Sequence, residues 1–218
     1  MTHHHDAPAR HIESRLIDRL LFFSDAVFAI VLTLLVIELH PPHLPAGSPE
    51  FYEELATRLT HVVFFAMSFA LVAIFWAAHM SILRSLQVFD WPVAWINLAF
   101  LFTIALMPFG TSMLMAQGIT QISWQIYSAI LIGASLGQTL LWLFVSRGGG
   151  RLMGGVDWRE LLLRTMRGLA PGIAFAGGFY AAYIGRMDVA VWCWVLIVPL
   201  MLVFRIVFAS KRASKASG

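Results

Sequence analysis

The sequence predicts an all-α integral membrane protein with six transmembrane helices in each subunit. Of its 218 residues, 59% are hydrophobic and only 12% are charged, whereas soluble domains carry about 25% charged residues. Long apolar stretches recur along the chain, and each reaches the ~20 residues that a helix needs to cross a bilayer. The net charge of +3 is distributed as membrane topology requires, so the sequence predicts lipid and no nucleic acid as its partner.

Helix-start and helix-stop residues separate the expected spans. Pro41 and Pro42 end the first span, and Ser48-Pro49 starts the second with a serine cap and a proline in the first turn. Pro108 is expected to kink the third, and Asp157 with Glu160 to form a capping pair at the start of the fifth. The six spans are expected at residues 17–39, 49 to beyond 80, 93–114, 122–145, 157–184 and 189–208.

The positions of the basic residues predict the orientation. Thirteen of the fifteen lysines and arginines fall on one side of this partition, and only Arg58 and Arg186 fall on the other. By the positive-inside rule, both termini are cytoplasmic. The expected organisation is a cytoplasmic segment at 1–15, a transmembrane domain at 16–209 and a cytoplasmic tail at 210–218. The first fifteen residues contain no apolar stretch, so no cleavable signal peptide is expected.

Two smaller features concern packing. Gly133 and Gly137 form a small-xxx-small pattern, which favours close approach of two membrane helices. Cys193 is the single cysteine, so no internal disulfide is possible, and its apolar surroundings favour an inert thiol.

The first span has two different faces on a helical wheel. At about 100° per residue, Ile30, Leu34 and Ile37 lie within about 60° of one another, whereas Asp25 lies about 140° from Ile30. A carboxylate at the centre of a membrane helix costs roughly 2.5–3.5 kcal/mol, so it is usually paired and functional. From the helix alone, the apolar stripe either faces lipid or core, with Asp25 paired inside the bundle, or it faces a water-filled path.

The segment Arg19-Leu-Leu-Phe-Phe23-Ser24-Asp25 fits the pattern R-x-x-x-F-S-D. It resembles the transmembrane protein 175 family of potassium channels, in the bacterial form with one repeat, because the chain has a single F-S-D. Trp76, His79 and Asn97 match the family's tryptophan, histidine and asparagine in the second and third spans.

The resemblance implies a potassium-selective channel of the cell membrane, formed by a homotetramer whose first helices surround the pore. Ile30 is then the constriction, Thr33 the intervening polar position, and Leu34 and Ile37 the next layers outward. The motif residues brace the pore helix, with His79 and Asn97 as expected partners of Arg19, Ser24 and Asp25. Arg19 fits this role less well, because the wheel places it near the pore stripe. The residues expected in this bracing network are Arg19, Phe23, Ser24, Asp25, Trp76, His79 and Asn97.

Ion selection is expected to be modest. The chain has no T-V-G-Y-G filter, so a ring of backbone carbonyls is not available to coordinate the ion. An aliphatic ring at Ile30 acts by dehydration, and potassium sheds water more readily than sodium. Glu38 at the outer end either concentrates cations or is an inert exposed carboxylate. No cofactor or bound metal is expected beyond the permeating potassium ion.

Three other classes of protein are alternatives to a channel. An intramembrane enzyme needs a catalytic constellation, and the sequence has no H-E-x-x-H, no G-x-G-D and no paired intramembrane aspartates on separate helices. His61 and His79 lie 18 residues apart on one span, so they are about 27 Å apart and cannot ligate one haem. A proton-coupled transporter is the strongest alternative, since Asp18, Asp25, Glu38 and His79 could form a proton path.

Overall fold

The computed structural model describes residues 6–147 and 152–193, and these ranges fold into helices joined by short connections. The helices are α1 (Asp6–Ile37), α2 (Pro49–Leu83), α3 (Trp91–Ala105), α4 (Met107–Gln117), α5 (Gln121–Arg147) and α6 (Trp158–Tyr183). A further helix begins at residue 187 and is described as far as 193. The all-α fold predicted from the sequence is therefore confirmed.

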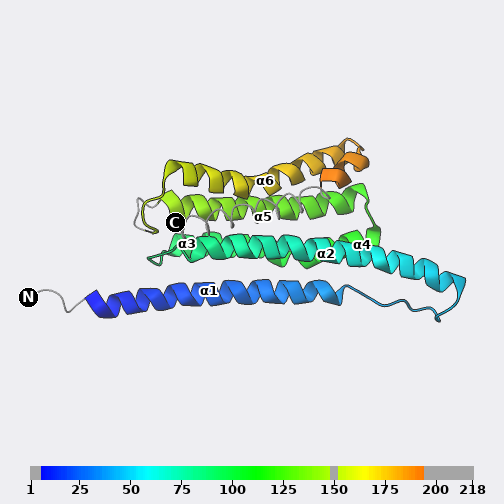
Figure 1. Cartoon of the computed structure of the whole chain (residues 1–218), viewed down its shortest axis with the longest axis horizontal. Coiled ribbons are helices and arrows are strands. Elements are labelled where there is room, and N and C mark those ends of the chain that lie inside the picture. Colours follow the sequence, from blue (N-terminus) through cyan, green and yellow to red (C-terminus); the bar gives the residue numbers. More distant parts are fainter. Residues whose placement is uncertain (1–5, 148–151, 194–218) are drawn as a thin grey trace, which may run out of the picture.

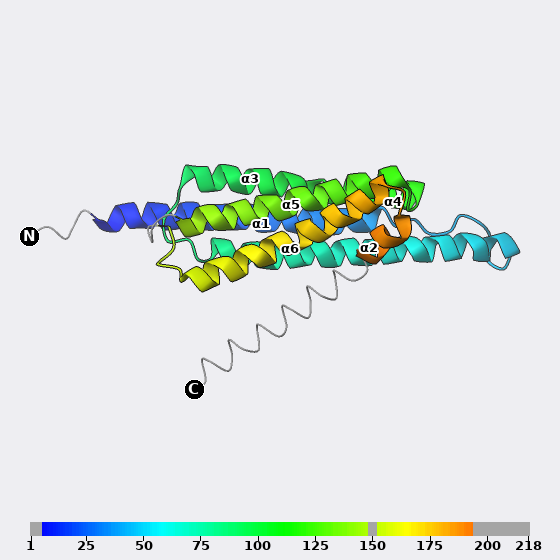
Figure 2. The same ribbon diagram turned by 90° about the horizontal axis from the view of Figure 1, so that it is seen from above.

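The helices run nearly parallel to one long axis and are stacked in layers (Figure 1). α1 forms one outer layer, α2, α3 and α4 lie next to it, and α5 and α6 complete the stack. Seen from above, α2 and α3 lie on opposite sides of α1 (Figure 2). α1 therefore packs against the rest of the chain with one face only.

The start of α2 follows the sequence prediction. Ser48 is the N-cap with extended backbone angles, its hydroxyl accepts a hydrogen bond from the backbone N–H of Phe51 at 3.1 Å, and Pro49 follows in the first turn. The helix has 35 residues, which corresponds to about 52 Å at 1.5 Å per residue. This exceeds the ~30 Å hydrocarbon core, and Figure 1 shows the first turns of α2 projecting beyond the other helices.

The kink expected at Pro108 is a complete break between α3 and α4. Leu106 separates the two helices, and Pro108 lies at the second position of α4. Proline has no N–H to donate to the carbonyl of Ile104, and its ring would collide with that carbonyl in a continuous helix. The third predicted span is therefore made of two helices in line.

Small residues bring α5 close to its neighbours. A Cβ added at Gly137 would lie 3.2 Å from the Cα of Phe100 on α3, and one added at Gly133 would lie 3.3 Å from Cγ2 of Thr103. The predicted close packing at this glycine pair is confirmed. On the other side of α5, the hydroxyl of Ser135 donates to the carbonyl of Gly168 at 2.5 Å.

The prediction of a capping pair at the start of α6 is correct for the position of the N-cap and wrong for the side-chain hydrogen bond of Asp157. Asp157 occupies the N-cap with extended backbone angles, but its side chain makes no capping hydrogen bond. The carboxylate of Glu160 forms an ion pair with Arg164 one turn later, at 2.6 Å. Arg164 also lies over the ring of Trp142, 4.8 Å from its centroid.

Four stretches of the described chain are long and apolar enough to cross a membrane: Glu13–Ile37, Pro49–Leu83, Trp91–Gln117 and Gln121–Ser146. They correspond to the first four predicted spans. The fifth predicted span is a helix of 26 residues, α6, but it lies outside this set because arginines and glycines lower its hydropathy. The sixth, at 189–208, lies largely outside the described residues, as does the tail at 210–218.

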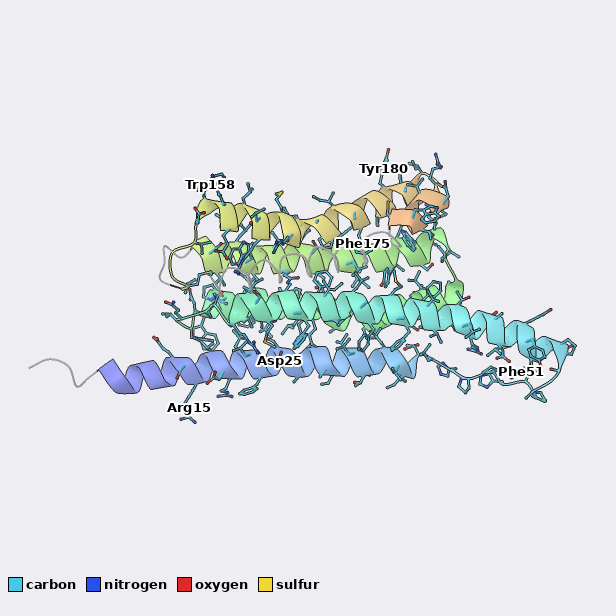
Figure 3. All side chains as sticks on the ribbon, viewed as in Figure 1. Arg15, Asp25, Phe51, Trp158, Phe175 and Tyr180 are labelled. Atoms are coloured by element: carbon cyan, nitrogen blue, oxygen red, sulfur yellow. The ribbon has the colours of Figure 1, made fainter. Side chains whose placement is uncertain are left out.

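Aromatic residues mark both ends of α6 (Figure 3). Trp158 and Tyr180 are both exposed and lie at opposite ends of this helix. They are 22 positions apart, which corresponds to about 33 Å, close to the thickness of the hydrocarbon core. Tryptophan and tyrosine favour the two membrane interfaces, so this spacing is consistent with α6 spanning a bilayer.

Candidate functional site: the outer face of α1 and the network behind it

The apolar stripe of α1 faces away from the rest of the chain. Ile30 is 57% exposed, Leu34 41% and Ile37 66%, although all three lie in a stretch of α1 that is apolar enough to cross a membrane. Thr33 is exposed on the same face, and its hydroxyl donates to the carbonyl of Ile30 at 2.8 Å. The stripe is therefore not part of the chain's own core.

The opposite face of α1 is the one that packs. Ser24, Phe28, Val31 and Leu35 recur at helical spacing and are all at most 2% exposed. The three apolar members belong to a core that also contains residues of α2 and α3. The rotation of α1 is therefore fixed by this inner row, which turns the Ile30 stripe outward.

A chain of polar side chains ties α1 to α3 and α2 inside this packed region. The hydroxyl of Ser24 donates to the carbonyl of Leu20 at 2.8 Å and accepts from Nδ2 of Asn97 at 3.0 Å. Oδ1 of Asn97 is 2.6 Å from Nε2 of His79. Because the amide nitrogen of Asn97 faces Ser24, its oxygen must accept, and His79 must carry its proton on Nε2. All three residues are at most 1% exposed.

Aromatic rings enclose His79, the histidine of this hydrogen-bonded group. His79 stacks on Phe100 with ring centroids 5.2 Å apart and an angle of 19° between the planes. Phe28 of α1 lies 5.6 Å from the same imidazole and 6.0 Å from Phe100. Sequence reasoning missed both phenylalanines. The signal available for Phe28 was its position four residues after Ser24, on the same helical face.

Asp25 has a different partner from Ser24. The indole N–H of Trp76 donates to Oδ1 of Asp25 at 2.8 Å, and this bond lies at the exposed edge of the contact between α1 and α2. Figure 3 shows Asp25 on the side of α1 that faces α2. Arg19 is exposed and, within the described residues, takes part in neither group. Phe23 is exposed on the outer face. The structure therefore brings together five of the seven predicted network residues, in two separate groups.

The loop that follows α1 is hydrogen-bonded to a side chain of α2. The carboxylate of Glu54 accepts hydrogen bonds from the backbone N–H groups of His43 and Leu44 at 3.0 and 3.3 Å, and it pairs with Arg58 at 2.9 Å. These bonds fasten the loop at 38–48 to the projecting part of α2. Glu38, the residue predicted at the outer mouth, lies half-buried one residue beyond the end of α1.

A second polar cluster was not foreseen from the sequence. The hydroxyl of Thr111 on α4 donates to Ser68 on α2 at 2.9 Å, and Ser68 is 3.0 Å from the hydroxyl of Tyr127 on α5. All three residues are fully buried. They lie just beyond the break between α3 and α4, and they join three helices there. Their separations of 43 and 59 residues left no local signal in the sequence.

The fold and the two faces of α1 define a multi-pass helical protein of the cell membrane. Comparison with family models gives a match over residues 19–108 to the family described as the endosomal/lysosomal potassium channel TMEM175. This range covers the R-x-x-x-F-S-D segment, the part of α1 from residue 19 onward, and all of α2 and α3. The resemblance to the transmembrane protein 175 family is thereby confirmed.

Individual relatives support the same assignment. A protein of Chryseobacterium sp. (strain P1-3) named as a potassium channel is 31% identical over 123 residues, which are 56% of this chain and 62% of that protein. A rat protein named as the endosomal/lysosomal proton channel TMEM175 is 29% identical over 98 residues, which are 44% of this chain and 19% of the rat protein. The chain thus matches less than two thirds of the length of either relative.

A solved structure extends the likeness to most of the fold. The crystal structure of a lysosomal potassium-selective channel TMEM175 homolog from Chamaesiphon minutus superposes with a TM-score of 0.70 and 21% identity. The match covers 87% of this chain and 97% of that one. The helical arrangement in Figures 1 and 2 is therefore that of this homolog's fold.

Proposed function

We propose that this protein is a cation channel that prefers potassium over sodium, assembled from four copies of the chain around a central pore. Each copy contributes α1, and its outward stripe lines the path, with Ile30 at the constriction, Leu34 and Ile37 further out, and Thr33 between them. A single subunit cannot enclose a path with one such helix, so the pore requires several copies. Potassium is the permeating substrate, and no cofactor takes part.

The observation that carries this proposal is the outward stripe. α1 exposes Ile30, Leu34 and Ile37 on one face while its other face is packed, and one relative is named as a potassium channel. Selection would come from dehydration, because an aliphatic ring offers no oxygen ligands and an ion must shed water to pass it. The hydroxyl oxygen of Thr33, already oriented by its bond to the carbonyl of Ile30, would offer a polar contact just beyond the ring.

The proposed network has a structural role in this channel. Ser24, Asn97 and His79 would hold the rotation of α1, and Asp25 with Trp76 would hold its position along α2. None of these five residues would line the pore. Arg19 projects on the same side as the stripe in the helical wheel, so it would lie at the cytoplasmic entrance, where a long side chain can reach solvent.

The test is the reversal potential of purified protein in a planar bilayer, with potassium on one side and sodium on the other. A reversal displaced toward the potassium equilibrium potential is expected. Absence of current from protein that light scattering shows to be an intact oligomer would contradict the proposal and favour a proton-coupled transporter. Because a rat relative is named as a proton channel, the same membrane is also tested with a pH gradient and no potassium or sodium.

A further inference from the structure

A hydroxyl of α5 is inserted into the hydrogen-bond ladder of α6. In a regular α-helix, the N–H of Gly172 would donate to the carbonyl of Gly168, four residues earlier. In this chain, the hydroxyl of Ser135 on α5 accepts from the N–H of Gly172 at 2.9 Å and donates to the carbonyl of Gly168 at 2.5 Å. The hydroxyl therefore bridges two backbone groups that bind each other directly in an unbroken helix.

The same turn of α6 also contains a proline and two glycines. Pro171 lies inside the helix and has no N–H to donate to the ladder. Gly168 and Gly172 flank it, and a glycine inside a helix is about 1 kcal/mol less favourable than alanine. A proline and an inserted side chain each kink helices, and Figure 1 shows α6 bent in its middle. Residues 168–172 are therefore the turn at which α6 bends most easily.

The interruption between α3 and α4 lies at nearly the same level of the bundle. A Cβ added at Gly133 of α5 would lie 3.3 Å from Thr103 near the end of α3, and one added at Gly110 of α4 would lie 2.8 Å from Ile130 of α5. The interruption therefore lies beside the part of α5 between these two positions, and Ser135 follows two residues later. Five residues of α5 correspond to about 8 Å, so the breaks in both neighbouring helices fall within about one and a half turns.

We infer that this level is a hinge, about which α4 and the part of α6 after Gly172 move against the rest of the bundle, and that the Ser135 hydroxyl holds the bent state of α6. α5 runs unbroken across the level and contacts both α4 and α6.

The straight state of α6 leaves no polar group of this turn without a partner. The N–H of Gly172 and the carbonyl of Gly168 then bond to each other. The hydroxyl of Ser135 turns to the carbonyl four residues earlier on α5, as serine and threonine do inside helices. Thr139, one turn further, already makes this bond to the carbonyl of Ser135 at 2.8 Å. Because the bent and straight states form equal numbers of hydrogen bonds, neither is excluded by an unsatisfied buried group.

The outer part of α1 packs against the segment that moves. Val31 and Leu35 of α1 share one hydrophobic core with Leu114 and Met115 of α4, and Ile30 directly precedes this packed part of α1. Displacement of α4 therefore displaces the part of α1 next to the constriction. This step rests on the proposed function, and it makes the hinge a device that opens and closes the pore.

Distances between two spin labels test the hinge. Cys193 is the single cysteine, so Cys193→Ser gives a cysteine-free background. Leu162→Cys with Tyr180→Cys places one label in each half of α6, and Ile122→Cys with Leu140→Cys is the control on α5; both pairs are 18 positions apart and exposed. Labelled protein is diluted with unlabelled protein, so that only distances within one copy are measured.

An unbroken helix places positions 18 residues apart at about 27 Å. Double electron–electron resonance should show a narrow distribution near this distance for the α5 pair. The α6 pair should give a broader distribution that extends to distances shorter by several ångströms. A distribution for the α6 pair that is as narrow as that of the α5 pair overturns the inference.

Two substitutions test the role of the inserted hydroxyl. Ser135→Ala removes the bridge, and Pro171→Ala returns an N–H to α6, so each should narrow the distribution of the α6 pair and shift it toward about 27 Å. Pro171→Ala keeps the test available if Ser135→Ala does not fold. The control is Ser128→Ala, because Ser128 of α5 is buried and its hydroxyl has no hydrogen-bond partner within the described residues. An unchanged distribution in folded Ser135→Ala and Pro171→Ala, or an equal shift in Ser128→Ala, overturns the inference.

Single-channel recording separates failure of the hinge from failure of the proposed function. Ser135→Ala should change the open probability several-fold and leave the reversal potential unchanged, because Ser135 lies between α5 and α6 and does not line the pore. A narrowed distribution with an unchanged open probability overturns the coupling of the hinge to the pore. A broad distribution for the α6 pair in an intact oligomer without current supports the hinge and removes the channel.

Discussion

The indole N–H of Trp76 on α2 donates a hydrogen bond to Oδ1 of Asp25 on α1, with 2.8 Å between the nitrogen and the oxygen. Asp25 is the carboxylate that interrupts the apolar stretch of α1, and its partner lies 51 residues further along the chain. The preceding residue, Ser24, lies on the inner side and accepts a hydrogen bond from Nδ2 of Asn97 on α3. Two adjacent residues thus connect α1 to two different helices. Together they fix the rotation of α1 about its axis and its position along that axis relative to α2 and α3.

Removal of the indole N–H should weaken the attachment of α1 to α2. Trp76→Phe keeps an aromatic ring but leaves Oδ1 of Asp25 without its donor. A hydrogen bond to a charged group contributes about 1.5–3 kcal/mol, and the exposed position of this one favours the lower end. We expect a lower midpoint in thermal unfolding of the detergent-solubilised protein. Trp95→Phe, at an exposed indole of α3, is the control, and an equal effect of both changes would contradict a specific role for Trp76.

Loss of the buried hydrogen bonds that join Ser24, Asn97 and His79 should lower the stability more than loss of the exposed bond between Trp76 and Asp25. Asn97→Leu leaves Nε2–H of His79 without its acceptor and removes the bond to Ser24, whose hydroxyl keeps its bond to the carbonyl of Leu20. Each unsatisfied buried polar group costs about 1–3 kcal/mol. Chemical unfolding in mixed micelles is expected to rank the stabilities as wild type, Asn97→Ser, then Asn97→Leu, because serine keeps one polar partner. If Asn97→Leu is as stable as the wild type, the hydrogen bonds of Asn97 contribute nothing to the free energy of unfolding.

Local rules of the sequence were enough to predict several parts of this fold. The cap at Ser48, the interruption near Pro108 and the close approach at Gly133 and Gly137 each depend on a few neighbouring residues, and each is found. Helical periodicity also separated the Ile30 stripe of α1 from the face that carries Asp25, but it left both the direction of the stripe and the buried row at Phe28 and Val31 undetermined.

Features that depend on distant residues were beyond those rules. The sequence did not predict which residue hydrogen-bonds to Ser24 and which to Asp25, because this pairing depends on how α2 and α3 pack against α1. The cluster of Ser68, Thr111 and Tyr127 is invisible in any local window for the same reason. At the start of α6, the side chain of Asp157 makes no capping hydrogen bond, and Glu160 forms an ion pair with Arg164 one turn later.

Close packing of α5 on α6 gives a prediction about stability with a control on the same helix. A Cβ at Gly168 would lie 2.6 Å from the hydroxyl oxygen of Thr139, whereas one at Gly177 meets nothing within 4 Å. Overpacking costs typically about 1–3 kcal/mol, while glycine to alanine in an open helical position gains up to about 1 kcal/mol. Gly168→Ala should therefore lower the unfolding midpoint, and Gly177→Ala should leave it unchanged or raise it. The same sign for both would mean that the helices do not approach as described.

The proposed constriction gives a prediction about conductance. Ile30→Asn replaces an apolar ring by one that can hydrogen-bond water and ions, so the dehydration barrier should fall. Single-channel recording is expected to show larger conductance and a reversal potential displaced toward zero under potassium against sodium. Leu136→Asn, at an exposed position of α5, should change neither quantity. Permeation that is unchanged by Ile30→Asn would remove Ile30 from the pore.

The hydroxyl of Thr33 can be tested against a nearly identical hydroxyl elsewhere in the chain. Thr33 donates to the carbonyl of Ile30 at 2.8 Å, and Thr103 of α3 donates to the carbonyl of Phe100 at 2.7 Å, three residues before it in both cases. Valine at either position keeps the shape and removes the hydroxyl, so loss of the local bond is common to both variants. If the oxygen of Thr33 also meets the permeating ion, only Thr33→Val should shift the reversal potential, toward weaker preference for potassium. Equal reversal potentials for the two variants would leave dehydration at Ile30 as the whole basis of selection.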